Sequence, residues 1–173
     1  MAFFDKAMTR AATISVCGRY RYSLWRVWNT SKPLLCWVML NPSKANATED
    51  DHTIRWCIRY AAENGYGGIV VVNLFAFRAT MPADMKAAAD PIGPDNDAML
   101  AAVLKDVVRT GGKVLVAWGV HGEFQDRDRE VLKVITKYYR QAPLCLDVTI
   151  KGHPKHPARL SPRLKLRAYE GRP

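Results

Sequence analysis

The sequence predicts an α/β fold: a three-layer α/β/α sandwich whose helices cover both faces of a mostly parallel central sheet. Two observations support this class. Short apolar runs without polar alternation, such as residues 34–40, are typical of strands buried on both faces. Segments with helical spacing of apolar residues separate these runs, and such alternation builds parallel sheets through right-handed crossovers. We expect one domain over residues 1–173.

The N-terminal part, residues 1–33, is expected to contribute a β-hairpin. Residues 12–28 carry β-branched and aromatic side chains around Gly18, and Arg and Tyr alternate over residues 19–22. This composition favours a hairpin or edge strands that lead into the main sheet.

The first central strand, residues 34–40, must end at Asn41 because Pro42 cannot donate to a sheet ladder. Asn41 would then lie at the carboxyl end of a buried strand, where open α/β sheets bind their ligands. The alternative is that the Asn-Pro-Ser sequence only forms a turn that ends the strand.

The later elements follow the same logic. They are a helix over about residues 51–64, a strand over 69–74, a helix from Asp95 or Asn96 to about Val108, a strand over 114–118, a helix over about 125–139 and a strand over 144–148. Asp50 or Asp51 is the expected N-cap of the first helix, and Gly65 ends it. The long loop over residues 75–95 exceeds a simple connection, and such loops are usually functional.

Composition indicates a cytoplasmic, globular protein without a membrane span or signal peptide. Hydrophobic residues make up 49% of the chain, yet no apolar run approaches 18 residues. The four cysteines are far apart and form no CxxC motif, so we interpret them as reduced residues rather than metal ligands. No metal or other cofactor is expected.

The charge is strongly and unevenly positive. The formal net charge is +10, and residues 151–173 hold seven Lys or Arg against one acid. A basic segment of this kind indicates a nucleic-acid partner, because Lys and Arg neutralise backbone phosphates. The alternative is a solvated, partly disordered tail.

Four short motifs at the predicted strand ends resemble those of the uracil-DNA glycosylase superfamily, in its mismatch-specific and single-strand-selective branches. These motifs are Asn41-Pro42-Ser43, the strand ending in Asn73, residues 115–119 (LVAWG) and residues 156–161 (HPARLS). They occur in the same order over about residues 34–161. The G-Q-D-P-Y-H motif of other branches is absent, which implies an Asn-type enzyme.

A second resemblance is closer but carries no activity. The combination of NPSKA, VVNLFAFRAT, DPIGPDND and AWG is similar to an uncharacterised bacterial and phage family known only as a domain of unknown function.

The glycosylase resemblance implies roles for catalytic residues. Asn41 would hold the attacking water, and His156 would donate a hydrogen bond to the departing base, with His153 as the other candidate histidine. Asp50 or Asp51 would stabilise the cationic sugar.

It also implies contacts with the base. Asn73 would read the base edge with Ser43 nearby, and Phe75 or Phe77 would stack on the base face. Asn73 could alternatively only cap the turn after its strand.

A third set of residues is assigned to the DNA backbone and stack. Leu160 would wedge into the base stack, or else lie in the core under a loop. The set is Lys44, Arg78, Lys155, Arg159, Leu160 and Ser161. The sequence thus predicts a DNA-binding N-glycosylase. The alternatives are a non-hydrolytic nucleic-acid-binding or DNA-modification protein that uses the same groove, and an enzyme acting on free nucleotides.

Overall fold

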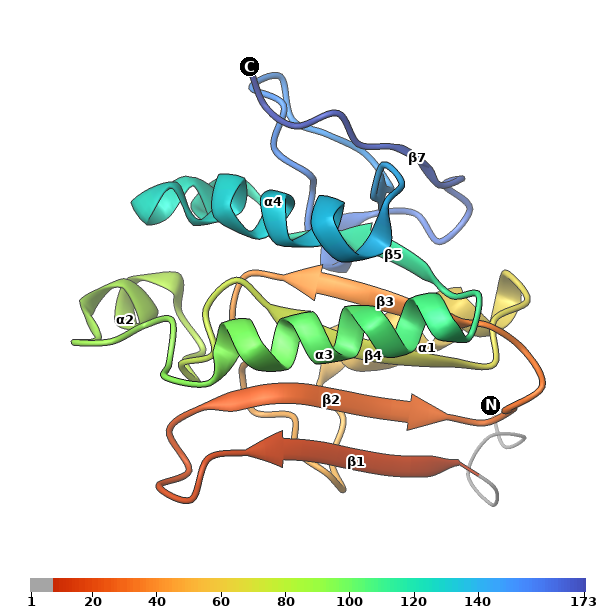
Figure 1. Ribbon diagram of the computed structural model, residues 1–173, viewed down its shortest axis with the longest axis horizontal. Coiled ribbons are helices and arrows are strands. Elements are labelled where there is room, and N and C mark those ends of the chain that lie inside the picture. The colour runs from red at the N-terminus through yellow and green to blue at the C-terminus, as the bar shows by residue number, and fades with distance from the viewer. Residues whose placement is uncertain (1–7) are drawn as a thin grey trace.

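The computed structural model describes residues 8–173, so the first seven residues of the predicted hairpin region lie outside the described residues. The strands are β1 (Thr9–Ile14), β2 (Arg21–Val27), β3 (Leu34–Met39), β4 (Gly68–Asn73), β5 (Lys113–Val116), β6 (Leu144–Cys145) and β7 (Arg167–Ala168). The helices are α1 (His52–Glu63), α2 (Pro82–Ala87), α3 (Asn96–Arg109) and α4 (Arg127–Tyr139), with short 3-10 segments η1 (Val120–Asp126) and η2 (Pro157–Arg159). The protein is therefore α/β, as the sequence predicts (Figure 1).

The strands form one mixed sheet in the order β1-β2-β4-β3-β5-β6-β7. Strands β4, β3, β5 and β6 are parallel to their neighbours within this group, whereas β1, β2 and β7 pair antiparallel. The expectation of a mostly parallel sheet is wrong. The β1–β2 hairpin forms, and β2 extends the main sheet beside β4. The connection from β2 to β3 over residues 28–33 is too short for the crossover that would make these two strands parallel.

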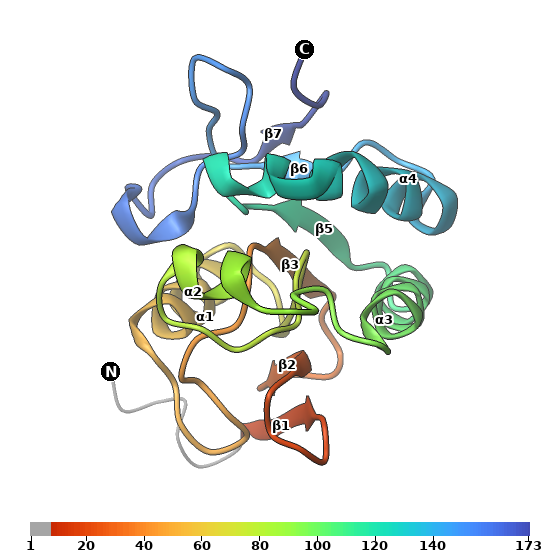
Figure 2. The same ribbon diagram turned by 90° about the vertical axis from the view of Figure 1, so that its left-hand side faces the viewer.

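Alternate residues of β3 face two separate cores. Cys36 and Val38 pack with residues of α3 and α4, and Leu35 and Trp37 pack with residues of α1. Figure 2 shows α1 on one side of the sheet and α3 and α4 on the other. Burial on both faces explains why the strand sequences lack polar alternation.

The first helix begins and ends close to its predicted limits. The side chain of Asp51 accepts a hydrogen bond from the backbone N–H of Ile54 at 2.9 Å and caps α1. The chain leaves the helix through Asn64 and Gly65, whose φ of 84° favours glycine.

Two later elements differ from the prediction. The long loop over residues 75–95 contains the short helix α2, and the strand expected over residues 144–148 spans only Leu144–Cys145. After Cys145 the chain turns out of the sheet, because the backbone N–H groups of Thr149 and Lys155 bond within the following loop.

The basic C-terminal segment is folded onto the protein. Strand β7 pairs with β6, and the Tyr169 side chain is buried, with its hydroxyl donating to the carbonyl of Gly152 at 3.0 Å. The end of the segment is therefore attached to the domain, whereas Arg163, Lys165 and Arg167 remain exposed to solvent. Among the helices of residues 8–173, none has the length and apolar character needed to cross a membrane.

Candidate functional site

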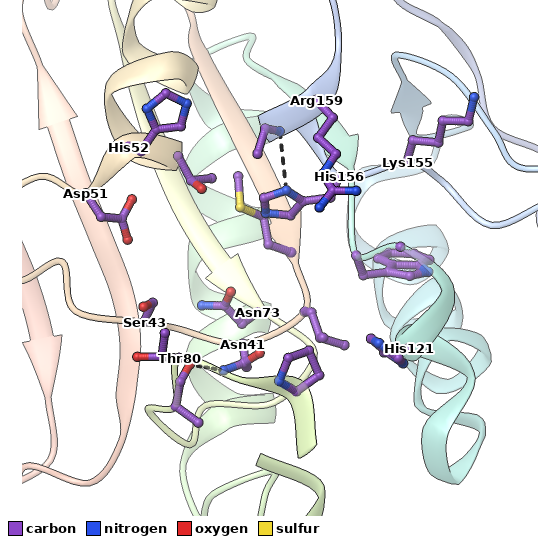
Figure 3. A pocket seen from close by; sticks show the side chains of 18 of the residues that line it. Asn41, Ser43, Asp51, His52, Asn73, Thr80, His121, Lys155, His156 and Arg159 are labelled. Atoms are coloured by element: carbon purple, nitrogen blue, oxygen red, sulfur yellow. Dashed lines mark hydrogen bonds between the residues drawn. The ribbon is translucent and has the colours of Figure 1, made fainter. Parts of the chain in front are cut away.

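A cavity of about 800 Å³ opens at the carboxyl edge of β3, β4 and β5. Its wall includes the ends of these strands and residues that follow them, Arg21 of β2, the first turn of α1, and residues between positions 149 and 160 (Figure 3). Ligands of open α/β sheets bind at this edge, and the volume falls in the range of small-molecule sites, roughly 300–1,000 Å³. The parallel register places Met39 opposite Asn73, which brings the ends of β3 and β4 together.

Asn41 lines the cavity and clamps two loops. Its Nδ2 donates to the carbonyls of Ala79 at 2.8 Å and Pro42 at 3.1 Å, and the Ala79 N–H returns a hydrogen bond to the carbonyl of Pro42. Because these bonds use the amide nitrogen, Oδ1 remains as an acceptor for a ligand or water.

Asn73 lines the same cavity, although its side chain is almost completely buried. Only 1% of the residue is exposed, and its Nδ2 has no hydrogen-bond partner among residues 8–173. The backbone around it is held firmly: Asn96 Nδ2 donates to the carbonyls of Asn73 at 3.1 Å and Leu74 at 3.0 Å, and Arg127 Nε donates to the carbonyl of Leu74 at 2.9 Å. A fixed donor without an acceptor is suited to binding a ligand acceptor.

His156 reaches the cavity from the loop that follows β6. The backbone N–H of Gly119 donates to the carbonyl of Pro154 at 2.8 Å and anchors this loop to the end of β5. Nδ1 of His156 accepts a hydrogen bond from the Ala158 N–H at 3.3 Å, so the neutral imidazole carries its hydrogen on Nε2. Solvent reaches the ring through the cavity, yet burial by the surrounding protein lowers its pKa. His156 is therefore a neutral hydrogen-bond donor at pH 7.

His153 has a different environment. It is buried, its Nε2 lies 3.4 Å from a carboxylate oxygen of Glu123, and it is not part of the cavity wall. Of the two histidines that the sequence left open, the structure places His156 at the cavity.

Asp50 and Asp51 also have separate places. Asp51 lines the cavity while capping α1. Asp50 lies outside the cavity wall, where it accepts from Arg26 Nε at 2.8 Å and Arg10 at 2.7 Å. Asp50 therefore neutralises arginines and is not available to a sugar in the cavity.

Neither phenylalanine proposed for base stacking lines the cavity. Phe75 is completely buried and packs on Phe124, with ring centroids 5.7 Å apart, and Phe77 packs edge-on against Tyr20. The pairing of β4 with β3 continues past the strand ends and carries Phe75 into the core, because its N–H bonds to the carbonyl of Leu40. The structure therefore does not bring either phenylalanine to the cavity; among the described residues, Trp118 is the one Trp, Tyr or Phe in its wall.

Ser43 lies where the main cavity adjoins a smaller one of about 250 Å³. The smaller cavity is lined by Ser43, Lys44, Arg78, Ala79 and Thr80. Arg78 donates from Nη1 to the carbonyl of Gly18 at 3.1 Å, and Lys44 is exposed. Lys44 and Arg78 therefore lie beside the main cavity rather than in its wall.

The predicted DNA-contact residues of the C-terminal segment are only partly brought together. Lys155, Arg159 and Leu160 line the cavity, whereas Ser161 is exposed outside its wall. Lys155 Nζ lies 2.6 Å from Oδ2 of Asp147, and this hydrogen bond is the main reason why the pKa of Asp147 is lowered. The charge of Lys155 is thus partly neutralised within the protein.

Four residues that line the cavity were not among the candidates from the sequence: Arg21, His52, Thr80 and His121. Arg21 extends from β2, is only 3% exposed, and donates from Nη1 to the carbonyl of Ala45 at 2.7 Å. The alternation of Arg and Tyr over residues 19–22 was the sequence signal at this position, and that pattern cannot show that Arg21 begins β2 and is buried while Arg19 lies in the preceding turn.

The described residues contain no group of three or more His, Cys, Asp or Glu side chains arranged to hold a metal ion. Comparison with known protein families matches residues 21–158 to a family described as "Protein of unknown function (DUF1643)". The chain belongs to this family. The matched region includes the cavity residues from Arg21 through Ala158, and it leaves out Arg159 and Leu160. No curated protein matches the sequence significantly.

Proposed function

We propose that the protein binds DNA in the cytoplasm and removes a base by hydrolysing its N-glycosidic bond, on an α/β/α sandwich of the uracil-DNA glycosylase type. One observation supports this proposal best. Asn41, Asn73 and His156, which the sequence resemblance assigns to water, base and leaving group, come from three separate segments and line one cavity.

The side chains suit the charges that develop in the reaction. The glycosidic C–N bond breaks with its electron pair leaving on the base, where the Nε2–H of His156 donates to a carbonyl oxygen. Water held by Oδ1 of Asn41 adds to the sugar carbon and loses its proton to solvent, while the carboxylate of Asp51 stabilises the cationic sugar. Asn73 contacts the base edge, and Trp118 provides an aromatic surface in the same cavity.

A second candidate, an enzyme that acts on free nucleotides, is favoured by the charge pairing of the C-terminal segment. Lys155 and Arg167 both pair with Asp147, at 2.6 and 3.0 Å, and Arg172 pairs with Asp128 at 2.7 Å. These pairs weaken the attraction that the basic segment exerts on a phosphate backbone. The small-molecule dimensions of the cavity agree with this candidate as well.

Base release decides between these functions. Single-turnover base release is measured from single-stranded and duplex oligonucleotides that carry a panel of bases, with strand scission after alkali as the readout. Release of the base is also measured from the matching free nucleotides. His156→Ala and Asn41→Ala are each expected to lower release by on the order of 10²-fold, the effect of losing one preorganised group. Asn64→Ala is the matched control, because Asn64 caps the far end of α1.

The outcomes are distinct. Release that both His156→Ala and Asn41→Ala leave unchanged contradicts the site assignment. Release from free nucleotides alone establishes the second candidate. Binding of DNA without release from any substrate indicates the non-hydrolytic protein.

DNA affinity is tested by its salt dependence. Truncation would remove buried Tyr169, so the triple variant Lys151→Gln, Arg163→Gln, Lys165→Gln is preferred; all three side chains are exposed. On duplex DNA, the slope of log affinity against log salt should become less steep by about 0.9 for each phosphate that the variant no longer neutralises. A DNA affinity that does not change with salt concentration would contradict the DNA-binding proposal.

A further inference from the structure

Three arginines are buried within residues 8–173, and they differ in their partners. Arg26, with 0% exposed, pairs with Asp50 at 2.7 Å and also donates to backbone carbonyls. Arg127, with 2% exposed, pairs with Asp97 and Glu130. These two charges are neutralised inside the protein, as buried charges normally are.

Arg21 is the exception among the three. No carboxylate of the described residues lies within ion-pair distance of its guanidinium, and its buried Nε has no hydrogen-bond partner. Within residues 8–173, the hydrogen bond of its Nη1 goes to the neutral carbonyl of Ala45. Burial lowers the pKa of Arg21 to about 10, while the charge of Asp51 raises this pKa and the charges of Arg78 and Arg26 lower it, so Arg21 remains a cation at pH 7.

The position of this cation indicates its use. Arg21 belongs to the wall of the main cavity, together with Asn41, Asn73 and His156. A guanidinium has donors and no acceptor, so a ligand group that binds it must be a hydrogen-bond acceptor. Negative charge on that acceptor makes the bond charge-assisted and stronger.

We propose that Arg21 is the binding site for an anionic group, a carboxylate or a phosphate, carried by the nucleobase or nucleotide that enters this cavity. The inference deepens the proposed function and rests on it for the kind of ligand. The anion has two possible sources: an acidic substituent on the base, or the 5′-phosphate of a free nucleotide. In both cases the ligand supplies the ion-pair partner that Arg21 lacks among the described residues.

The experiment compares two ligand pairs whose members differ by one acidic group. These pairs are 5-carboxyuracil with uracil, and thymidine 5′-monophosphate with thymidine. Dissociation constants are measured by calorimetry at low salt for the full-length protein and for Arg21→Met, Arg21→Lys and Arg109→Met. Arg109→Met is the matched control, because Arg109 is an exposed residue at the end of α3, outside the cavity wall.

In the wild type, the anionic member of at least one pair should bind about tenfold tighter or more, the scale of a hydrogen bond to a charged group. Arg21→Met should abolish this preference, Arg21→Lys should retain part of it, and Arg109→Met should leave it unchanged. The pair that shows the preference identifies the source of the anion.

The proposal is overturned if the wild type shows no preference in either pair, or if folded Arg21→Met keeps it. Circular dichroism establishes that the variant is folded, and Arg21→Lys provides the test if it is not. Because this experiment measures binding, failure of the Arg21 proposal is distinguishable from failure of the glycosylase proposal. Base release without a charge preference leaves the glycosylase proposal standing. A charge preference without base release leaves the Arg21 site standing.

Discussion

Two buried asparagines that lie side by side should respond oppositely to the same substitution. Asn73 and Asn96 are each 1% exposed, but Asn73 Nδ2 has no partner among the described residues, whereas Asn96 Nδ2 makes two hydrogen bonds to strand-end carbonyls. An unsatisfied buried donor costs about 1–3 kcal/mol. Asn73→Leu removes that cost at similar side-chain size, so we expect the ligand-free protein to gain about 1 kcal/mol, or about 2–4 °C in Tm.

Asn96→Leu should have the opposite effect. The substitution removes two hydrogen bonds that each contribute about 0.5–1.5 kcal/mol, and it leaves the carbonyl of Asn73 without the Asn96 Nδ2 donor. Together these losses should destabilise the protein by about 2–3 kcal/mol. Tm should fall by roughly 4–12 °C.

Thermal and urea unfolding of the ligand-free protein, followed by circular dichroism, measures both changes. The reasoning that Asn73 is retained for a ligand is refuted if Asn73→Leu is destabilised by as much as Asn96→Leu. Such a result would mean that the Asn73 amide stabilises the fold itself.

Three further predictions concern other residues. Asp50→Ala should cost about 3–5 kcal/mol in urea unfolding because it leaves buried Arg26 unpaired; a change below about 1 kcal/mol would contradict the structural role of Asp50. Cys17 is exposed and its pKa is lowered to about 7, chiefly by the hydroxyl of Ser15, whereas burial raises the pKa of Cys36, Cys57 and Cys145. Iodoacetamide at pH 7 should therefore label one thiol per native chain and none in Cys17→Ser, as counted by mass spectrometry. Burial lowers the pKa of His156 in the folded state, so the unfolded chain binds the extra proton first as pH falls below about 6.5, and this residue reduces stability there. The Tm of His156→Gln should therefore fall less than the Tm of the wild type between pH 7 and pH 5. Equal decreases in Tm would show that His156 does not contribute.

Local sequence patterns predicted most of the elements correctly. The apolar run over residues 34–40 became β3, and the helical spacing after Asp51 became α1 with that residue as its cap. The direction of β2 was beyond such patterns, since an antiparallel strand that joins a sheet edge has the same composition as a separate hairpin. Together with the antiparallel pairs β1–β2 and β6–β7, this pairing makes the sheet mixed rather than mostly parallel.

The candidate site divides in the same way. Asn41 was predicted because strand ends in a parallel sheet meet at one edge, whereas the glycosylase resemblance supplied Asn73 and His156; all three line the cavity. Phe75 was misplaced because sequence position after a strand does not show to which side the side chain turns, and backbone pairing with Leu40 directs it into the core.

The sequence by itself determined the α/β class, the positions of the central strands β3, β4 and β5, and the strand-end asparagines, because those depend on hydrophobic period and on proline and cap chemistry over a few residues. Only the tertiary structure decided which charges are neutralised. Asp50 is bound to Arg26 and Lys155 to Asp147, while Arg21 is buried beside the cavity without a carboxylate partner among the described residues. Partners of this kind are far apart in the chain, and their pairing depends on how the strands and loops meet in space.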